Sequence, residues 1–309
     1  MRNICKKTFA LLLALALAAC MSLTAFAQPS FEERQYFRAG DYNICYRVVP
    51  AKGEEAGRIF FIHGLISSSL FWEDLAGFFS EAGYMCAMMD LPGFGYSTRE
   101  APDVTPKDRE EIAAELMERL APGEPWIVAG HSMGGGVAVN IATMYPEKVS
   151  SLLLYAPGSV GGGTYGSGLM RAIAEPVGAV LRFLVSPAIN GDLLPRLIFG
   201  LANADLPYAM AYDIARVTDS LKEAHTIQSV MHMSYRARPV DFAAASRLDI
   251  PILVIWAQWD YILAARRVSD MKTALTRAQQ QTIRDGHFFP EHSAAEVFNR
   301  TLAFLEEAA

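Results

Sequence analysis

Short apolar runs alternate with stretches of helical spacing along most of this chain. The apolar runs fall at 58–62, 84–89, 126–129, 149–155 and 251–256. Between them, apolar residues recur every three or four positions, for example over 70–82 and 105–120. Fully apolar strands alternating with amphipathic helices are typical of a mostly parallel sheet covered on both faces. The pattern therefore predicts an α/β fold, with a last strand at 281–284 and a final helix at about 293–307.

Two local features, at 35–49 and at 105–106, add detail to the predicted fold. Residues 35–49 alternate apolar and polar positions on either side of Ala39-Gly40-Asp41, which predicts a hairpin and an antiparallel edge to the sheet. Thr105-Pro106 predicts a helix start, with Thr105 as the N-cap and Pro106 at the first helical position.

The stretch from 158 to 245 breaks the alternation. It opens with a glycine-rich link, 158–168, and continues with helical spacing interrupted by prolines. A segment of this length is too long for a simple loop, so it predicts a small helical subdomain. Its many apolar residues either pack on the core or line a ligand pocket, and the sequence leaves both possibilities open.

The N-terminus has the pattern of a targeting segment. Arg2, Lys6 and Lys7 precede an apolar stretch at 9–23, and Ala25-Phe26-Ala27 resembles a cleavage site. Residues 1–27 are therefore predicted to be a signal peptide, and the protein to be exported. Lipid attachment at Cys20, or retention of the leader as an anchor, remains an alternative that would place the protein at a membrane.

Composition narrows the range of partners. The 309 residues are 52% hydrophobic and carry a formal net charge of −6, without a basic stripe, so nucleic acid is not expected as a partner. Beyond the leader, Cys45 and Cys86 lie in apolar strand-like runs. Two buried free thiols are expected, with a disulfide as the alternative. Neither has metal-ligand spacing, and no metal or cofactor is expected.

One short motif carries candidate chemistry. Gly130-His131-Ser132-Met133-Gly134 follows the apolar run 126–129 and precedes a helical run from Gly135 to Tyr145. A serine between a buried strand and a helix, with glycines two residues to either side, is the nucleophile elbow pattern. Larger side chains at the glycine positions would collide with the neighbouring strand and helix.

Several further motifs accompany the elbow in chain order. They are His63-Gly64, Asp90-Leu91-Pro92-Gly93-Phe94-Gly95-Tyr96-Ser97, Asp260 and Gly286-His287. With these motifs the chain resembles the α/β-hydrolase superfamily over nearly all of residues 28–309. The resemblance implies an eight-stranded, mostly parallel sheet with helices on both faces. It also implies a core at 28–157 and 246–309 interrupted by a helical cap at 158–245.

The resemblance assigns a triad. Ser132 would be the nucleophile, and His287, placed straight after the last expected strand, would be its base. His292, five residues later, suits a cap or surface role better. Asp260 follows the strand at 251–256 and would orient the imidazole. The preceding strand ends in Ala156-Pro157 without a carboxylate, so the other position that the family uses for its acid is not available.

The resemblance also implies an oxyanion site made by the backbone N–H groups of Leu65 and Met133. His63, Asp90 and Ser97 are expected to be structural. Together these residues predict a cofactor-independent serine hydrolase acting on a small, apolar ester or acyl substrate. The alternatives are C–C bond hydrolysis, amide cleavage or cofactor-free peroxidation on the same fold, and a non-catalytic binding protein.

Overall fold

The computed structural model describes residues 33–99, 104–159, 191–223 and 225–308, and the side chains of 234–236 are not described. The expected signal peptide, Cys20 and residues 160–190 of the expected cap lie outside these ranges. The described strands form one eight-stranded sheet in the order β1-β2-β4-β3-β5-β6-β7-β8. Only the pairings of β2 with β1 and with β4 are antiparallel. The expected α/β-hydrolase fold class is confirmed.

The strands span β1 Gln35–Ala39, β2 Tyr42–Val49, β3 Gly57–Ile62, β4 Tyr84–Met89, β5 Trp126–His131, β6 Val149–Tyr155, β7 Ile252–Ala257 and β8 Gln279–Ile283. The central strands β3 and β4 have consecutive buried residues, because both faces of the sheet are covered. The edge strand β8 buries only Ile283. Its start at Gln279, two residues earlier than expected, is fixed by parallel pairing with β7.

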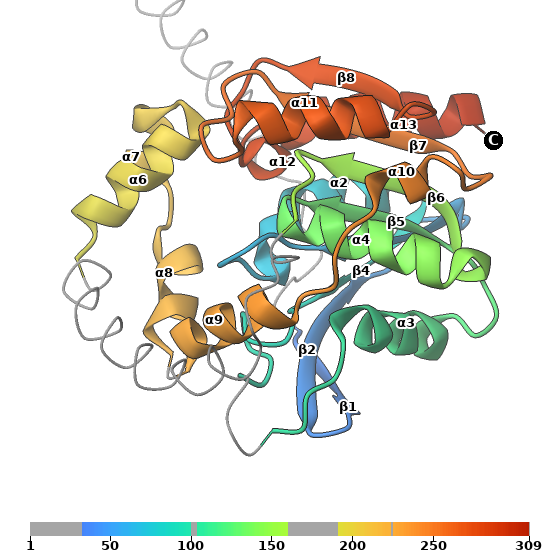
Figure 1. Cartoon of the computed structure of the whole chain (residues 1–309), viewed down its shortest axis with the longest axis horizontal. Helices are drawn as coiled ribbons and strands as arrows, with labels where there is room; N and C mark the ends of the chain where they lie inside the picture. The colour runs from blue at the N-terminus through green and yellow to red at the C-terminus, as the bar shows by residue number, and fades with distance from the viewer. Residues whose placement is uncertain (1–32, 100–103, 160–190, 224, 309) are drawn as a thin grey trace, which may run out of the picture. The chain divides into compact units, whose positions relative to one another are not determined.

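Helices cover the two faces of the sheet (Figure 1). Those outside the segment between β6 and β7 are η1 Ser69–Trp72, α2 Glu73–Glu81, α3 Arg109–Leu120, α4 Met133–Met144, η2 Pro146–Lys148, α11 Ala265–Ala274, α12 Phe289–His292 and α13 Ala294–Ala308. Helix α4 packs on β5 and β6 and against α3, whereas α2 packs on β4 and against α13. Figure 1 shows α3 and α4 in front of the sheet and α2 behind it.

The described part of the segment between β6 and β7 consists mainly of helices joined by turns and irregular stretches. It contains α6 Leu193–Asn203, α7 Leu206–Ala211, α8 Ala215–Lys222, α9 Thr226–Arg236 and α10 Phe242–Ala245. We call α6 to α9 the inserted helices; they lie together at the left of Figure 1. The domain boundaries at 157/158 and 245/246 stay a prediction.

Two helix starts differ from the expectation. The helix expected from Thr105 begins at Arg109, because the Thr105 amide donates to Asp41 Oδ2 (2.9 Å) and ties that residue to the hairpin turn. Thr105 is therefore not an N-cap, and the expectation was wrong. The helix expected over 70–82 is divided, since η1 precedes α2, and the Ser69 amide donates to the buried Asp90 carboxylate (2.6 Å).

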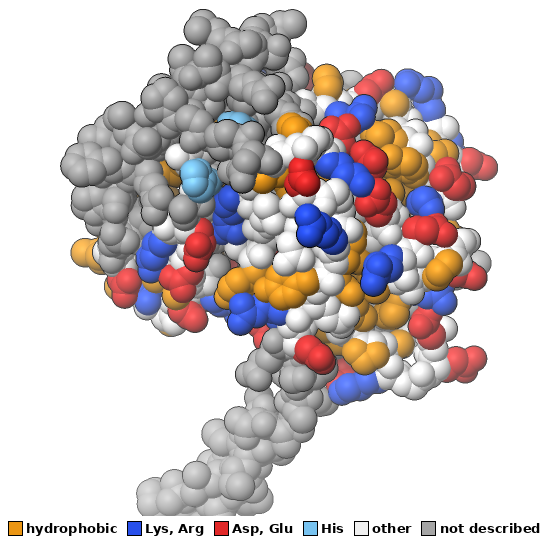
Figure 2. Space-filling model, turned by 90° about the horizontal axis from the view of Figure 1, so that it is seen from below, with side chains coloured by type: hydrophobic (Ala, Val, Ile, Leu, Met, Phe, Trp, Pro, Cys, Tyr) orange, Lys and Arg blue, Asp and Glu red, His pale blue; other side chains and the backbone are white. Residues whose placement is uncertain are grey.

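Other expectations about the core are confirmed. The hairpin forms with the register Ala39 to Tyr42, and Cys45 and Cys86 are buried free thiols. Burial raises the pKa of the Cys45 thiol to about 12, so this thiol stays protonated and unreactive near neutral pH. No helix among the described residues combines the length and apolar character needed to cross a membrane. On the face drawn in Figure 2, acidic and basic side chains are interspersed with apolar ones.

Candidate active site

The turn between β5 and α4 holds Ser132 in an unusual backbone conformation. Its φ of 50° and ψ of −122° lie outside the regions that L-residues ordinarily occupy. The Ser132 amide donates to Tyr155 O of β6 (3.0 Å), and its carbonyl accepts from the Gly158 amide (2.8 Å). Bonds from neighbouring elements therefore fix the turn, as a strained conformation at a functional site requires.

The glycines of the motif are required by close backbone approach. A Cβ at Gly134 would collide with the carbonyl oxygens of Ile62, the last residue of β3, and of His63, which follows it. A Cβ at Gly130 would collide with Gly134. At Gly135 it would lie 2.8 Å from Pro157 Cβ. The absence of side chains lets α4 begin directly against the sheet, which places Ser132 at the N-terminus of α4.

His287 and Asp260 form a hydrogen-bonded pair. Asp260 lies after β7 and His287 after β8, and the distance from His287 Nδ1 to Asp260 Oδ2 is 2.7 Å. The other carboxylate oxygen, Oδ1, accepts from the amides of Ile262 and Leu263, both at 2.9 Å. Burial opposes ionisation of Asp260, but the His287 contact and the two amides together hold the pKa of its carboxyl below the usual range.

His63 orients the loop beside Ser132. Its Nε2 accepts from the Leu91 amide (2.9 Å), so the ring proton lies on Nδ1, which donates to Gly64 O (2.7 Å). Burial lowers the pKa of His63 and keeps the ring neutral. Because the peptide unit is planar, holding the Gly64 carbonyl also fixes the direction of the Leu65 N–H. His63 is structural in this arrangement.

The two expected oxyanion donors lie on either side of the serine. A Cβ added at Gly64 would lie 3.2 Å from Ser132 Cβ, so the loop carrying Leu65 touches the elbow. Met133 is the first residue of α4, where unpaired amides favour negative charge. Neither the Leu65 nor the Met133 amide has an acceptor among the described residues.

His131, within the Gly-His-Ser-Met-Gly motif, contacts the backbone of His287. Its Nε2 lies 2.9 Å from His287 O, and its ring stacks on Phe71 with centroids 4.7 Å apart. Burial, and secondly the neighbouring His287, holds the pKa of His131 well below its ordinary value. The neutral ring therefore donates its Nε2 proton to the His287 carbonyl.

A cavity of about 610 Å³ brings these groups together. Ser132, His287, Leu65 and Met133 all line it. Its other walls are mainly apolar and come largely from the inserted helices and the loop after Asp260: Leu194, Pro195, Ile198, Phe199, Ala202, Ile214, Val217, Leu221, Ile227, Ile262 and Leu263. No Asp, Glu, Lys or Arg is among the described lining residues. The site is therefore a wide apolar chamber with few polar groups.

The remaining expected residues have structural positions. Asp90 is fully buried and accepts from the amides of Ser69 (2.6 Å) and Tyr96 (2.7 Å). Ser97 Oγ accepts from the Cys45 amide and donates to Asp90 O (2.6 Å). Both hold the loop after β4 in place. Among the described residues, no group of three His, Cys, Asp or Glu side chains could hold a metal ion.

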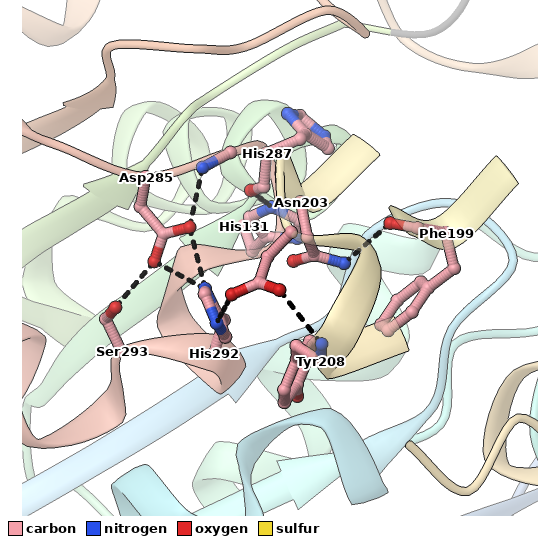
Figure 3. Close-up of polar contacts among 10 residues, drawn as sticks. His131, Phe199, Asn203, Tyr208, Asp285, His287, His292 and Ser293 are labelled. Carbon is pink, nitrogen blue, oxygen red and sulfur yellow. Dashed lines mark hydrogen bonds and ion pairs between the residues drawn. The ribbon is translucent and has the colours of Figure 1, made fainter. Parts of the chain in front are cut away.

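A second acid–histidine pair lies beside the first and was not anticipated from the sequence. His292 Nδ1 contacts the Asp285 carboxylate at 2.8 Å, and both residues flank His287 in the chain (Figure 3). His292 is thus half-buried against the same loop. The spacing Asp285, His287, His292 is visible in the sequence, but nothing in it shows that the inserted helices meet this pair.

Comparison with known proteins agrees with the fold and the motifs. A family model described as serine aminopeptidase, S33, matches residues 53–289. A 2-hydroxy-6-oxononadienedioate/2-hydroxy-6-oxononatrienedioate hydrolase of Escherichia coli K12 is 24% identical over 232 residues, 73% of this chain and 77% of that protein. An esterase of Mycobacterium tuberculosis is 34% identical over 103 residues, 33% of each chain.

Among solved structures, the enol-lactonase of Burkholderia xenovorans LB400 has a TM-score of 0.68 at 17% identity. The likeness covers 88% of this chain and 100% of that one. At this identity the likeness supports the fold alone. The family match covers well over half of the chain, so this protein is a hydrolase of the serine aminopeptidase S33 family, within the α/β-hydrolase superfamily.

Proposed function

We propose that this hydrolase cleaves uncharged carboxylic esters through a Ser132–His287–Asp260 triad and an acyl-enzyme intermediate. The observation that carries the proposal is the shared cavity, in which an elbow serine and an acid-paired histidine face walls whose described residues include no charged side chain. A serine hydroxyl needs an adjacent base to act as a nucleophile, and His287 is the histidine on this cavity whose orientation a carboxylate fixes.

In the proposed reaction, Ser132 Oγ attacks the acyl carbonyl while His287 Nε2 takes the hydroxyl proton. Asp260 holds the Nδ1 proton and stabilises the imidazolium that forms. The Leu65 and Met133 amides donate hydrogen bonds to the developing oxyanion. His287 then returns its proton to the alcohol leaving group, and a water molecule activated by the same histidine releases the acid and restores Ser132.

The absence of charged side chains among the described lining residues favours esters over the activity that the family description names. An aminopeptidase must bind the free amino group of its substrate, and a buried ammonium needs a carboxylate or several acceptors. The described lining residues offer no carboxylate. The volume of about 610 Å³ lies within the range of small-molecule sites and suits an apolar acyl chain.

A graded substrate panel tests this proposal. Esters from acetyl to dodecanoyl should show kcat/KM rising to an interior maximum, because each buried methylene adds up to about 0.8 kcal/mol until the cavity is full. Amino-acid esters and amides with a free amine should react more slowly. Ser132→Ala provides the background rate.

A flat chain-length series would contradict an apolar acyl pocket. A preference for substrates with a free amine would contradict the ester proposal and favour amide cleavage. A panel extended to C–C cleavage substrates and to peroxidation covers the remaining alternatives on the same fold.

A further inference from the structure

The segment that carries His287 is fastened by polar contacts that the proposed chemistry does not use. We call residues 284–293 the histidine loop. Within it, the buried Asp285 carboxylate accepts from the Gly286 amide (2.6 Å), His292 Nδ1 (2.8 Å) and Ser293 Oγ (2.5 Å). These bonds close the loop on itself around His287.

The inserted helices grip the same loop from outside. The His287 amide donates to Ala202 O at the end of α6 (2.7 Å), while the His287 carbonyl accepts from His131 on the core side. Gly286 leaves no room for a Cβ, because Asn203 and the Ala202 carbonyl occupy that space. The backbone of His287 is therefore clasped between α6 and the core.

His292 extends this grip to the corner between α6 and α7. Its Nε2 lies 3.5 Å from Asp205 Oδ2, and its ring lies against Tyr208 with centroids 4.3 Å apart. Asp205 is itself fixed, since its Oδ1 accepts from the Tyr208 amide (2.9 Å) as the N-cap of α7. Figure 3 shows His292 between Asp285 and Tyr208, with its dashed contacts to the acidic groups.

We propose that His292 is a positioning residue, which joins the α6–α7 corner to the histidine loop through Asp205 and Asp285 and so keeps His287 aligned with Ser132. The inference rests on the proposed function, because it assigns His292 a role only if His287 is the base. It adds a link between the inserted helices and the alignment of the triad.

The charge on His292 decides whether the link holds. An imidazolium carries a proton on each ring nitrogen, so it donates to Asp285 and forms an ion pair with Asp205, whereas a neutral ring has one proton. The hydrogen bond to Asp285 raises the pKa of His292; burial opposes this, and Asp205 adds to the rise. Once neutral, the ring keeps its Nδ1 proton, which it donates to buried Asp285, and the ion pair between Nε2 and Asp205 is lost.

The other titratable groups near His292 are Tyr208, which faces its ring, and Glu291, the preceding residue on α12. Burial raises the pKa of Tyr208, so its hydroxyl remains neutral at the pH values near neutrality where His292 changes charge. Burial raises the pKa of Glu291 to about 7, so Glu291 also changes charge near neutral pH and needs its own control.

The test is a double-mutant cycle read across pH, with kcat and KM for an uncharged ester measured on the full protein. His292→Ala and Asp205→Asn should each lower kcat three- to tenfold and change KM less than twofold. The double variant should be no slower than His292→Ala, because both changes break one link. As the pH rises and His292 loses its proton, kcat of the wild type should fall by the same factor as in the variants. The pH profile of kcat should lack this fall in both single variants.

Three controls make the result decisive. Glu291→Gln should keep the fall of kcat that accompanies deprotonation of His292. Asp108→Asn, which removes the ion pair with Arg238 away from the histidine loop, should leave kcat unchanged. Asp205→Glu should restore part of the loss, and the partly exposed Asp205 can be tested even if His292→Ala fails to fold.

Additive losses, an unchanged pH profile in Asp205→Asn, or an equal loss in Asp108→Asn would overturn the inference. Ser132→Ala separates this from failure of the proposed function. Full activity in Ser132→Ala defeats the triad itself, whereas an inactive Ser132→Ala with unchanged His292 and Asp205 variants defeats only the positioning role.

Discussion

Ser132 shows how single residues combine to shape the candidate site. A non-glycine residue at φ 50° and ψ −122° costs on the order of 1–3 kcal/mol, which the surrounding bonds must offset. Those bonds form only because Gly130 and Gly134 let strand, turn and helix approach within backbone contact. The glycines therefore fix the position of Ser132 through packing, although they carry no reactive group.

A matched pair of alanine substitutions tests this role. Gly134→Ala should lower the free energy of unfolding by several kcal/mol or prevent folding, because its Cβ meets rigid backbone of β3. Gly77 lies inside α2, and a Cβ added there would have no atom of another element within 4 Å. Gly77→Ala should therefore raise the free energy of unfolding by up to about 1 kcal/mol. Urea unfolding compares them, and a mild effect at Gly134 would contradict the packing argument.

The sequence indicated the residues of the proposed triad, but not the residues that hold them in place. Ser132 and His287 are marked by local motifs, and Asp260 by its place after a strand, so each could be named in advance. Asp205 and Asn203 have no such mark. They reach the histidine loop only through the docking of α6, a contact between segments about 80 residues apart that no local pattern encodes.

At the scale of elements, strands were easier to place than helix starts. Unbroken apolar runs predict buried strands, and β4 and β6 have the expected bounds. The start of α3 depends on Asp41, which is more than 60 residues earlier in the chain and bonds the Thr105 amide. Such a partner outweighs the local preference of Thr-Pro for a helix start.

The contact between α12 and the inserted helices predicts a pH-dependent stability. Glu291 accepts from the Tyr212 hydroxyl (2.8 Å), and burial raises its pKa to about 7 against the opposing effect of Arg216. In the unfolded chain it titrates near ~4.3. Between these values the folded state binds more protons, so stability falls as pH rises, and it levels off above the folded pKa.

Urea unfolding at pH 5 and pH 8 measures this effect. The wild type should lose on the order of 2 kcal/mol more than Glu291→Gln between the two values. His292, whose pKa is also raised, shifts stability in the same direction in both proteins, so only the difference is diagnostic. Glu296→Gln on the exposed face of α13 is the control. An identical pH dependence in Glu291→Gln would show that the buried carboxyl is not responsible.

At the scale of the whole molecule, the inserted helices contact both the cavity and the loop that carries His287. They supply apolar walls to the cavity, and through Ala202 and Asp205 they hold the loop that carries His287. The sequence predicted a helical insertion and left open whether its apolar residues face the core or a pocket. Leu194, Ile198 and Phe199 line the cavity, and of these three only Phe199 is buried. Leu193 and Leu201 are exposed and are not among the lining residues.

We also propose that the protein is exported and begins at Gln28 when mature. The basis is the basic start, apolar stretch and Ala25-Phe26-Ala27 of the leader. Intact-mass analysis of protein expressed with its leader should give the mass of residues 28–309. A diacylglycerol adduct on Cys20 would establish the lipoprotein alternative, and the mass of the full chain would establish a retained leader.

The triad itself is tested most directly by kcat/KM for an uncharged ester in Ser132→Ala, His287→Ala and their double variant. Each single change should lower kcat/KM by several orders of magnitude, with folding intact, and the double should be little worse, because the residues act as a unit. Asp260→Asn should cost less but still heavily, and His292→Ala should stay within about tenfold. Retained activity in Ser132→Ala, or an inactive His292→Ala beside an active His287→Ala, would contradict the assignment.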